Sequence, residues 1–182
     1  SKVTSLKDGG FVITWSGHGD QDGAGPGVFA QKYDDSGNRL GEEFKINTFF
    51  QSSEDPEDII GLEDGGFLVV YKETSDIIGE YFDILPQRYD KEGIKVGDEF
   101  LVNSLTDGNQ YDASAASLKN GNIVVVWSDD RGLETNSSGI NNIDSKIGIF
   151  GQLFNSQGDK IGTGFQDYLG NQWQFQVNSQ HE

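Results

Sequence analysis

The sequence has 182 residues and contains no cysteine, which excludes disulfide bridges, thiol nucleophiles and cysteine-ligated zinc sites. No apolar run approaches the ~18–20 residues that a membrane-spanning helix needs, so we expect no membrane insertion. Basic residues are scarce: 13 lysines and arginines stand against 30 aspartates and glutamates, which gives a net charge of −17. A surface of that charge repels nucleic acid and anionic lipid.

Only two histidines are present, His18 in a glycine-rich segment and His181 near the end of the sequence. A Ser-His-Asp site would need one of them held rigidly beside a nucleophile, and neither context provides this. A glycosidase would need a carboxyl group in an apolar context that raises its pKa, and no acid in the sequence has one. We therefore expect a non-enzymatic protein, with a glycosidase-type hydrolase as a distant alternative.

One phrase occurs three times in the chain. The copies are LKDGGFVITW from Leu6, LEDGGFLVVY from Leu62 and LKNGNIVVVW from Leu118, each 56 residues after the one before. A second phrase follows each copy and begins at Gln31, Gln87 and Gln152. A fixed period of this size indicates a repeat architecture. We expect a single β-repeat domain over residues 1–182, with repeats at 1–50, 51–106 and 107–182.

Each repeat is predicted to form four short antiparallel strands. The second strand is a nearly continuous apolar run in each copy, typical of a strand buried on both faces: Phe11–Trp15, Phe67–Tyr71 and Ile123–Trp127. An Asp-Gly or Asn-Gly pair precedes each run and favours a type I′ hairpin turn. The fourth strands are expected at residues 42–47, 98–103 and 174–178. Pro86 lies within an expected third strand, which predicts an edge strand or a shorter one.

A repeated four-stranded meander with an apolar second strand is the pattern of a β-propeller blade. The predicted fold class is therefore all-β, with three four-stranded antiparallel propeller-like blades. Propellers typically have ~4–8 blades, so we expect three blades to assemble with a second copy or to form part of a longer propeller. The end blades would each expose an apolar face, at second strands such as Phe11–Trp15 and Ile123–Trp127, and we expect those faces to be buried against another copy. A β-trefoil is the alternative, because it also has three copies of four strands and closes with three.

The third repeat carries two extra segments, at Glu134–Ser145 and Gly164–Gln174. Insertions in repeat proteins fall in loops, often on a binding face. The second insertion contains Tyr168 and Trp173, which are candidate contacts for a ligand. Because the two insertions are assigned to consecutive connections of a meander, we expect them on opposite rims of the blade.

The best candidate metal site is the segment Gly17–Gly27, where Asp20 and Asp22 alternate and Gly23 permits a sharp turn. Such a pattern resembles the opening of a calcium loop, in which several hard oxygen ligands converge on one ion. It lacks the distal glutamate of an EF-hand, so an acidic solvated loop is the alternative. Calcium is the one cofactor that the sequence raises, and we expect it to act through loop rigidity.

The two phrases resemble tandem segments of very large secreted bacterial surface proteins of the RTX-adhesin type. The first repeat matches that pattern at Leu6, Asp8, Gly9, Gly10, Phe11, Trp15, Gln31, Tyr33, Asp34, Gly37, Gly41, Glu43, Phe44 and Asn47. The resemblance covers essentially the whole chain and implies secretion to the extracellular space or cell surface, a propeller-like β fold and a structural or adhesive role. The calcium-binding nonapeptide G-G-x-G-x-D is absent, so the resemblance implies no metal chemistry.

Two functions follow from these patterns. The first is a non-enzymatic extracellular structural or adhesive module that self-associates through its blade edges or belongs to a longer propeller. The second is a lectin-like protein that binds surface glycans through Trp173 and through the aromatic residues that end the second strands. Those aromatic residues are Trp15, Tyr71 and Trp127, and packing between blades is their competing role.

Overall fold

The computed structural model describes residues 1–17, 27–48, 54–74, 81–104, 106, 108–130, 148–162 and 175–176. All regular secondary structure in these ranges is β-strand, so the described chain has no helix that could cross a membrane. The strands are β1 (Lys2–Ser5), β2 (Phe11–Gly17), β3 (Gly27–Tyr33), β4 (Arg39–Lys45), β5 (Asp55–Gly61), β6 (Phe67–Thr74), β7 (Phe82–Tyr89), β8 (Gln110–Ser117), β9 (Ile123–Asp129), β10 (Gly148–Phe154), β11 (Lys160–Ile161) and β12 (Phe175–Gln176).

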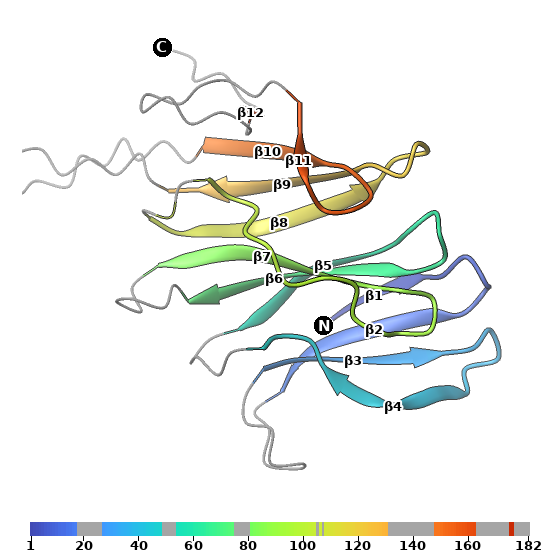
Figure 1. Ribbon diagram of the computed structural model, residues 1–182. Coiled ribbons are helices and arrows are strands. Elements are labelled where there is room, and N and C mark those ends of the chain that lie inside the picture. Colours follow the sequence, from blue (N-terminus) through green and yellow to red (C-terminus); the bar gives the residue numbers. More distant parts are fainter. Residues whose placement is uncertain are drawn as a thin grey trace, which may run out of the picture.

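The strands form three antiparallel sheets, one for each repeat, stacked one above another (Figure 1). The first sheet has the order β1-β2-β3-β4, and the middle sheet has the order β5-β6-β7. The third sheet runs β8-β9-β10, and both β11 and β12 pair with β10. The predicted all-β class with one antiparallel, blade-like sheet per repeat is confirmed.

The hairpin that joins the first two strands of each sheet has a three-residue loop, and the predicted type I′ turn is wrong. In the first repeat, the Gly9 N–H donates to the Leu6 carbonyl at 3.1 Å and the Leu6 N–H donates to the Gly10 carbonyl at 2.7 Å. Gly9 has a φ of 93°, whereas Asp8 is not in the left-handed region. A type I′ turn needs positive φ at both central residues, so the single left-handed glycine defines the longer loop.

The middle sheet has no regular fourth strand, and Pro86 in β7 supplies the physical reason. The Pro86 carbonyl faces Phe100, whose N–H lies 3.5 Å away. Because the N and C=O of one strand residue point to the same side, the N–H that proline lacks would also face this neighbour. The segment 95–103 still follows β7, and the Val102 N–H donates to the Ile84 carbonyl at 3.0 Å, but without a continuous ladder.

The fourth strand of the third repeat is divided into two short pieces. Both pieces keep the register of β4: Ile161 lies opposite Leu153 as Leu40 lies opposite Lys32, and Phe175 lies opposite Gly151 as Phe44 lies opposite Ala30. The second insertion therefore interrupts the fourth strand itself. The expectation that the two insertions occupy consecutive connections, and hence opposite rims, is corrected by this register.

Two hydrophobic cores lie between the stacked sheets, and the middle sheet contributes to both. Phe67, Val69 and Tyr71 of β6 belong to the core shared with the first sheet, and Leu68 and Val70 belong to the core shared with the third. All five side chains are fully buried. The predicted two-sided burial of the second strand is thus confirmed for β6, whereas β2 and β9 alternate between buried and half-buried residues.

Candidate functional site

Each sheet has two repeat-equivalent faces, and the described contacts between sheets always join one kind to the other. We call the face that carries Phe67, Val69 and Tyr71 in the middle sheet the leading face, and the face that carries Leu68 and Val70 the trailing face. The leading face of the middle sheet packs on the trailing face of the first, and the leading face of the third packs on the trailing face of the middle sheet.

A buried asparagine near the end of each of the first two repeats fastens one sheet to the next. Asn47 accepts the Val28 N–H at 2.9 Å and donates to the Glu54 carboxylate at 2.7 Å. Asn103 is its equivalent, and it accepts the Ile84 N–H at 3.1 Å and donates to Gln110 at 2.9 Å. Since Glu54 and Gln110 belong to the following repeats, each asparagine links the third strand of its own repeat to the next repeat.

Asn103 also donates to the Asp83 carboxylate, with 2.6 Å between Nδ2 and Oδ1. Burial raises the pKa of Asp83 above its ordinary value, and the hydrogen bond from Asn103 acts in the opposite direction. Among the described residues, the Asp83 carboxyl group has a structural role as a hydrogen-bond acceptor at the seam between the middle and third sheets.

A second recurring polar residue, the glutamine that opens each second phrase, is also buried. Gln31, Gln87 and Gln152 are 1%, 1% and 0% exposed. Each Nε2 donates to a carbonyl on the fourth-strand side: to Gly41 at 3.2 Å, to Gly97 at 3.3 Å and to Ile161 at 3.3 Å. These glutamines hold the outer edge of the sheet, so their recurrence reflects the scaffold.

The recurring turn residues have structural roles as well. The Asp8 carboxylate accepts the Gly10 N–H at 3.1 Å, and this hydrogen bond is the main cause of its lowered pKa. The Asp34 carboxylate accepts the Asn38 N–H at 2.7 Å and the Ser36 N–H at 3.0 Å, and hydrogen bonds from Asn38 lower its pKa most. Both aspartates therefore stabilise turns by accepting backbone hydrogen bonds.

The four predicted site residues, Asp20, Asp22, Tyr168 and Trp173, lie outside the described residues. Calcium binding and ligand binding at these positions therefore stay predictions. Among the residues that are described, no group of three metal-ligating side chains is placed to hold an ion. Thermal melting in calcium and then in chelator tests the calcium prediction, because a bound ion raises the midpoint, whereas an unchanged midpoint leaves Asp20 and Asp22 as ordinary surface residues.

The aromatic residues that end the second strands differ in their surroundings. Tyr71 and Trp127 are 0% and 1% exposed, and Trp127 stacks on Phe150 with 6.3 Å between ring centroids. These two side chains pack between sheets and are closed to a sugar. Trp15 is half-buried and stacks on Phe29 at 6.5 Å. It lies on the leading face of the first sheet.

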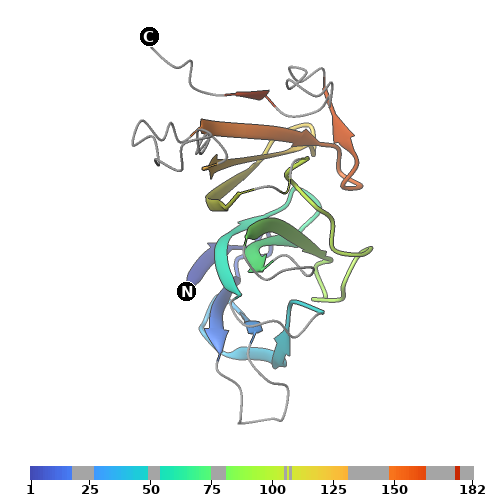
Figure 2. The same ribbon diagram turned by 90° about the vertical axis from the view of Figure 1, so that its left-hand side faces the viewer.

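Two sheet faces at opposite ends of the stack have no described sheet packed against them (Figures 1 and 2). The leading face of the first sheet carries the half-buried or exposed residues Val3, Phe11, Ile13, Trp15 and Tyr33. The trailing face of the third sheet carries the half-buried residues Val124, Val126, Ile149 and Leu153. We identify these two apolar faces, hereafter the open faces, as the candidate functional site.

The sharpest contrast is at one repeat position in the first strands. Val3 is 64% exposed, whereas Ile59, which stands 56 residues later, is 3% exposed in the core between the first two sheets. The two residues are chemically alike, and only the presence of a neighbouring sheet separates them. The sequence predicted apolar faces on the end blades, at the second strands Phe11–Trp15 and Ile123–Trp127, but not which side of each strand is open, because a strand that is open on one face here has the same apolar pattern as one covered on both.

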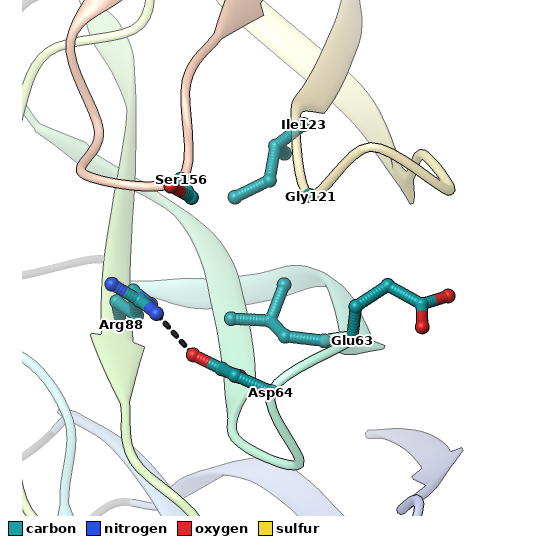
Figure 3. Close-up of a pocket in the computed structure, with 7 residues that line it drawn as sticks. Glu63, Asp64, Arg88, Gly121, Ile123 and Ser156 are labelled. Atoms are coloured by element: carbon teal, nitrogen blue, oxygen red, sulfur yellow. Dashed lines mark hydrogen bonds and ion pairs between the residues drawn. The ribbon is translucent and has the colours of Figure 1, made fainter.

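The hollows among the described residues do not offer a better site. One of about 110 Å³ lies between the middle and third sheets, where Arg88 forms an ion pair with Asp64 (Figure 3). Small-molecule pockets are usually ~300–1,000 Å³, so this space is too small. At the equivalent junction, Lys32 likewise pairs with Asp8, at 3.4 Å, and it also reaches across to the Lys91 carbonyl at 2.5 Å. Among the described contacts, Arg88 pairs only within the middle sheet, whereas Lys32 also bridges to the next sheet.

A larger hollow of about 490 Å³ runs beside the first strands of the sheets, but it is widely open to solvent and does not enclose a ligand. Its lining includes Ser5, Gly61 and Ser117, which occupy the same position in the three repeats. The first strands approach each other closely there, since a β-carbon on Gly61 would lie 2.5 Å from the Ser5 carbonyl oxygen. This arrangement is expected where the inner strands of neighbouring blades meet.

No protein-family model matches the chain, and no curated protein matches it. The resemblance to RTX-adhesin-type repeats and the extracellular location therefore stay predictions, and the site is argued from its own geometry.

Proposed function

We propose that the chain is a non-enzymatic extracellular structural or adhesive β-repeat module that associates through its open faces. The observation that supports this most is the pair of apolar sheet faces at the two ends of the stack. Every other leading or trailing face in the described structure is covered by a neighbouring sheet. The extracellular location rests on the resemblance of the repeated phrases alone.

The open faces are costly to leave in water. The Val3 side chain is 64% exposed, and Val3 lies opposite Ile13 in the register between β1 and β2. Apolar area that is removed from water contributes roughly 25 cal/mol per Å², so contiguous faces of this kind favour association. Repeat arrays generally cover such terminal faces with a polar cap or with another unit. The described part of the chain places no polar cap on either face.

The lectin-like alternative depends on residues of two kinds. Tyr168 and Trp173 lie outside the described residues, and the strand-ending Tyr71 and Trp127 are buried between sheets. Trp15 is half-buried on an open face, a position that suits association and sugar stacking equally. No described residue therefore favours this alternative over association, and the same holds for a glycosidase-type hydrolase.

The solution mass of the chain tests the proposed function. We expect multi-angle light scattering at micromolar concentration to give a mass above that of one 20.0 kDa chain and to give a lower mass on dilution. The association should persist in high salt, because apolar contacts are not screened as surface ion pairs are. A compact, monodisperse monomer across this range would overturn the proposal and would promote the lectin-like alternative, which glycan-array binding would then test.

A further inference from the structure

We infer that two copies of this chain associate head to tail, with the leading face of the first sheet of one copy packed on the trailing face of the third sheet of the other. This inference rests on the proposed function and names the surfaces that it would use. The two open faces are the unmatched halves of one repeated contact, which occurs twice inside the chain.

The leading face of the first sheet already has the side-chain arrangement of a covered leading face. Phe11 stacks on Tyr33 with centroids 4.9 Å apart and an interplanar angle of 7°. The equivalent pair in the middle sheet, Phe67 and Tyr89, stacks at 4.9 Å and 9°, and both rings are buried in the core against the first sheet. The open face would therefore accept a partner without rearranging this aromatic pair.

The trailing face of the third sheet is matched in the same way. Val124 and Val126 stand at the positions of Leu68 and Val70, which are fully buried against the third sheet. The pairing register places Leu153 opposite Val124, so the apolar surface extends across two strands. This face is aliphatic, whereas the leading face of the first sheet also carries aromatic side chains.

The internal contacts also set the direction of the new one. Both described interfaces join a leading face to a trailing face, and neither joins two faces of one kind. A contact between unlike faces is heterologous, so it gives a closed ring if the rotation between copies closes and an open filament if it does not. A contact between two leading faces would instead be isologous and would stop at a dimer.

One charged position distinguishes the new contact from the internal ones. Lys7 of the first sheet donates to the Glu63 carbonyl at 2.6 Å and pairs with its carboxylate at 3.4 Å. In the inferred contact, Lys119 takes the place of Lys7 and Lys7 of the other copy takes the place of Glu63. Two like charges would then face each other at the edge of the interface.

Three single substitutions in the full chain test the inference. Val3→Glu places a carboxylate on the leading open face, and Val126→Glu places one on the trailing open face. Ile94→Glu is the matched control, because Ile94 is 64% exposed, as Val3 is, and lies in a turn of the middle sheet away from both open faces. Far-UV circular dichroism and thermal melting establish that each variant is folded before its mass is measured.

We expect Val3→Glu and Val126→Glu each to weaken association at least about a hundredfold, because each places an unpaired carboxylate in a contact that excludes water. Ile94→Glu should associate as the wild type does. An equimolar mixture of the two defective variants should form a one-to-one dimer, since one retains an intact leading face and the other an intact trailing face. Lys119→Glu should tighten association by about two- to fivefold, an effect that disappears in high salt.

The failures are distinguishable. A wild-type chain that stays monomeric overturns both the proposed function and this inference. Association that survives Val3→Glu or Val126→Glu in a folded variant overturns the head-to-tail arrangement and leaves the proposed function standing. A mixture of the two defective variants that remains monomeric, although each is folded, also overturns the complementary contact.

Discussion

Replacing Asn103 with alanine should destabilise the protein more than any exposed polar substitution, because this side chain joins three groups at the seam between the middle and third sheets. Asn103 is 0% exposed. It accepts the Ile84 N–H at 3.1 Å, and it donates to Asp83 at 2.6 Å and to Gln110 at 2.9 Å. Alanine removes one partner from each of these buried groups at once.

The magnitude follows from the cost of burying a polar group that has lost a hydrogen bond, about 1–3 kcal/mol for each group. Neighbouring losses are not additive, so the three together should cost about 3–5 kcal/mol. Asn47→Ala removes a partner from two described groups, the Val28 N–H and the Glu54 carboxylate, and should cost about 2–4 kcal/mol. The exposed Asn38, which donates to Asp34 at 2.8 Å, provides the control and should cost less than about 0.5 kcal/mol when replaced by alanine.

Urea unfolding followed by far-UV circular dichroism measures the difference. With a slope near ~2 kcal/mol per molar urea, Asn103→Ala should lower the midpoint by about 1.5–2.5 M and leave the slope unchanged. The reasoning is refuted if the midpoint of Asn103→Ala falls within about 0.5 M of that of Asn38→Ala at equal slope. Such a result would mean that water or a rearranged side chain replaces the asparagine at no cost.

Three further predictions test other parts of the structure. Burial raises the pKa of Asp83 above 3.8, so the folded state holds the carboxyl proton more tightly than the unfolded chain does. The free energy of unfolding therefore falls as the pH rises above about 4. Asp83→Asn should raise the thermal midpoint at neutral pH, and this gain should vanish below about pH 3. Gly61→Ala should cost about 1–3 kcal/mol in urea unfolding, because its β-carbon would lie 2.5 Å from the Ser5 carbonyl oxygen, and an unchanged midpoint would contradict the close approach of the first strands. Trp127→Ala should cost about 3–5 kcal/mol in the same assay, whereas Trp15→Ala should cost less. Trp15→Ala should also weaken association, as measured by light scattering. Equal losses of stability in the two variants would contradict the difference between covered and open faces.

The period of the repeat predicted the fold well because it repeats the physical causes of the strands. Leu62, the left-handed Gly65 and the apolar run of β6 recur as one unit, and each unit forms one hairpin of its sheet. The two-residue loop predicted for the hairpin is wrong, because an Asp-Gly pair suits both a two-residue and a three-residue loop and only the backbone hydrogen bonds decide between them.

The fourth strands could not be predicted equally well, since their regularity depends on the neighbouring strand. Residues 98–103 resemble residues 42–47 closely, yet only β4 in the first repeat is a regular strand. The difference arises one strand away, where Pro86 replaces Ala30 and removes a donor from the ladder. The sequence predicts an edge strand or a shorter one from Pro86, and β7 is an edge strand of the middle sheet.

The candidate site was harder to predict than the fold. The sequence predicted that the end blades bury apolar faces against another copy, but it assigned the site residues to unusual positions, the acidic pair Asp20 and Asp22 and the aromatic residues of the second insertion. The open faces consist of ordinary strand residues, and Ile13 and Val69 differ little in chemistry although a sheet covers only Val69. Whether an apolar residue is a core residue or an interaction residue depends on what packs against it, and residue type does not reveal that.

The position of the second insertion in the third repeat shows how such a module can vary without losing its stacking. In the first repeat, the β3–β4 ladder shifts register between Ala30 and Lys32, and the Gln31 side chain bonds to fourth-strand carbonyls across this irregularity. The insertion enters at the equivalent point, between β11 and β12, where Gln152 bonds to the Ile161 carbonyl in the same way. Bulges tolerate extra residues because the ladder is already interrupted there. The leading and trailing faces consist mainly of second- and third-strand residues, so a change at the outer edge of a sheet leaves the contacts between sheets intact. The repeat can therefore vary at its outer edge while its faces keep the apolar residues that stack one sheet on the next.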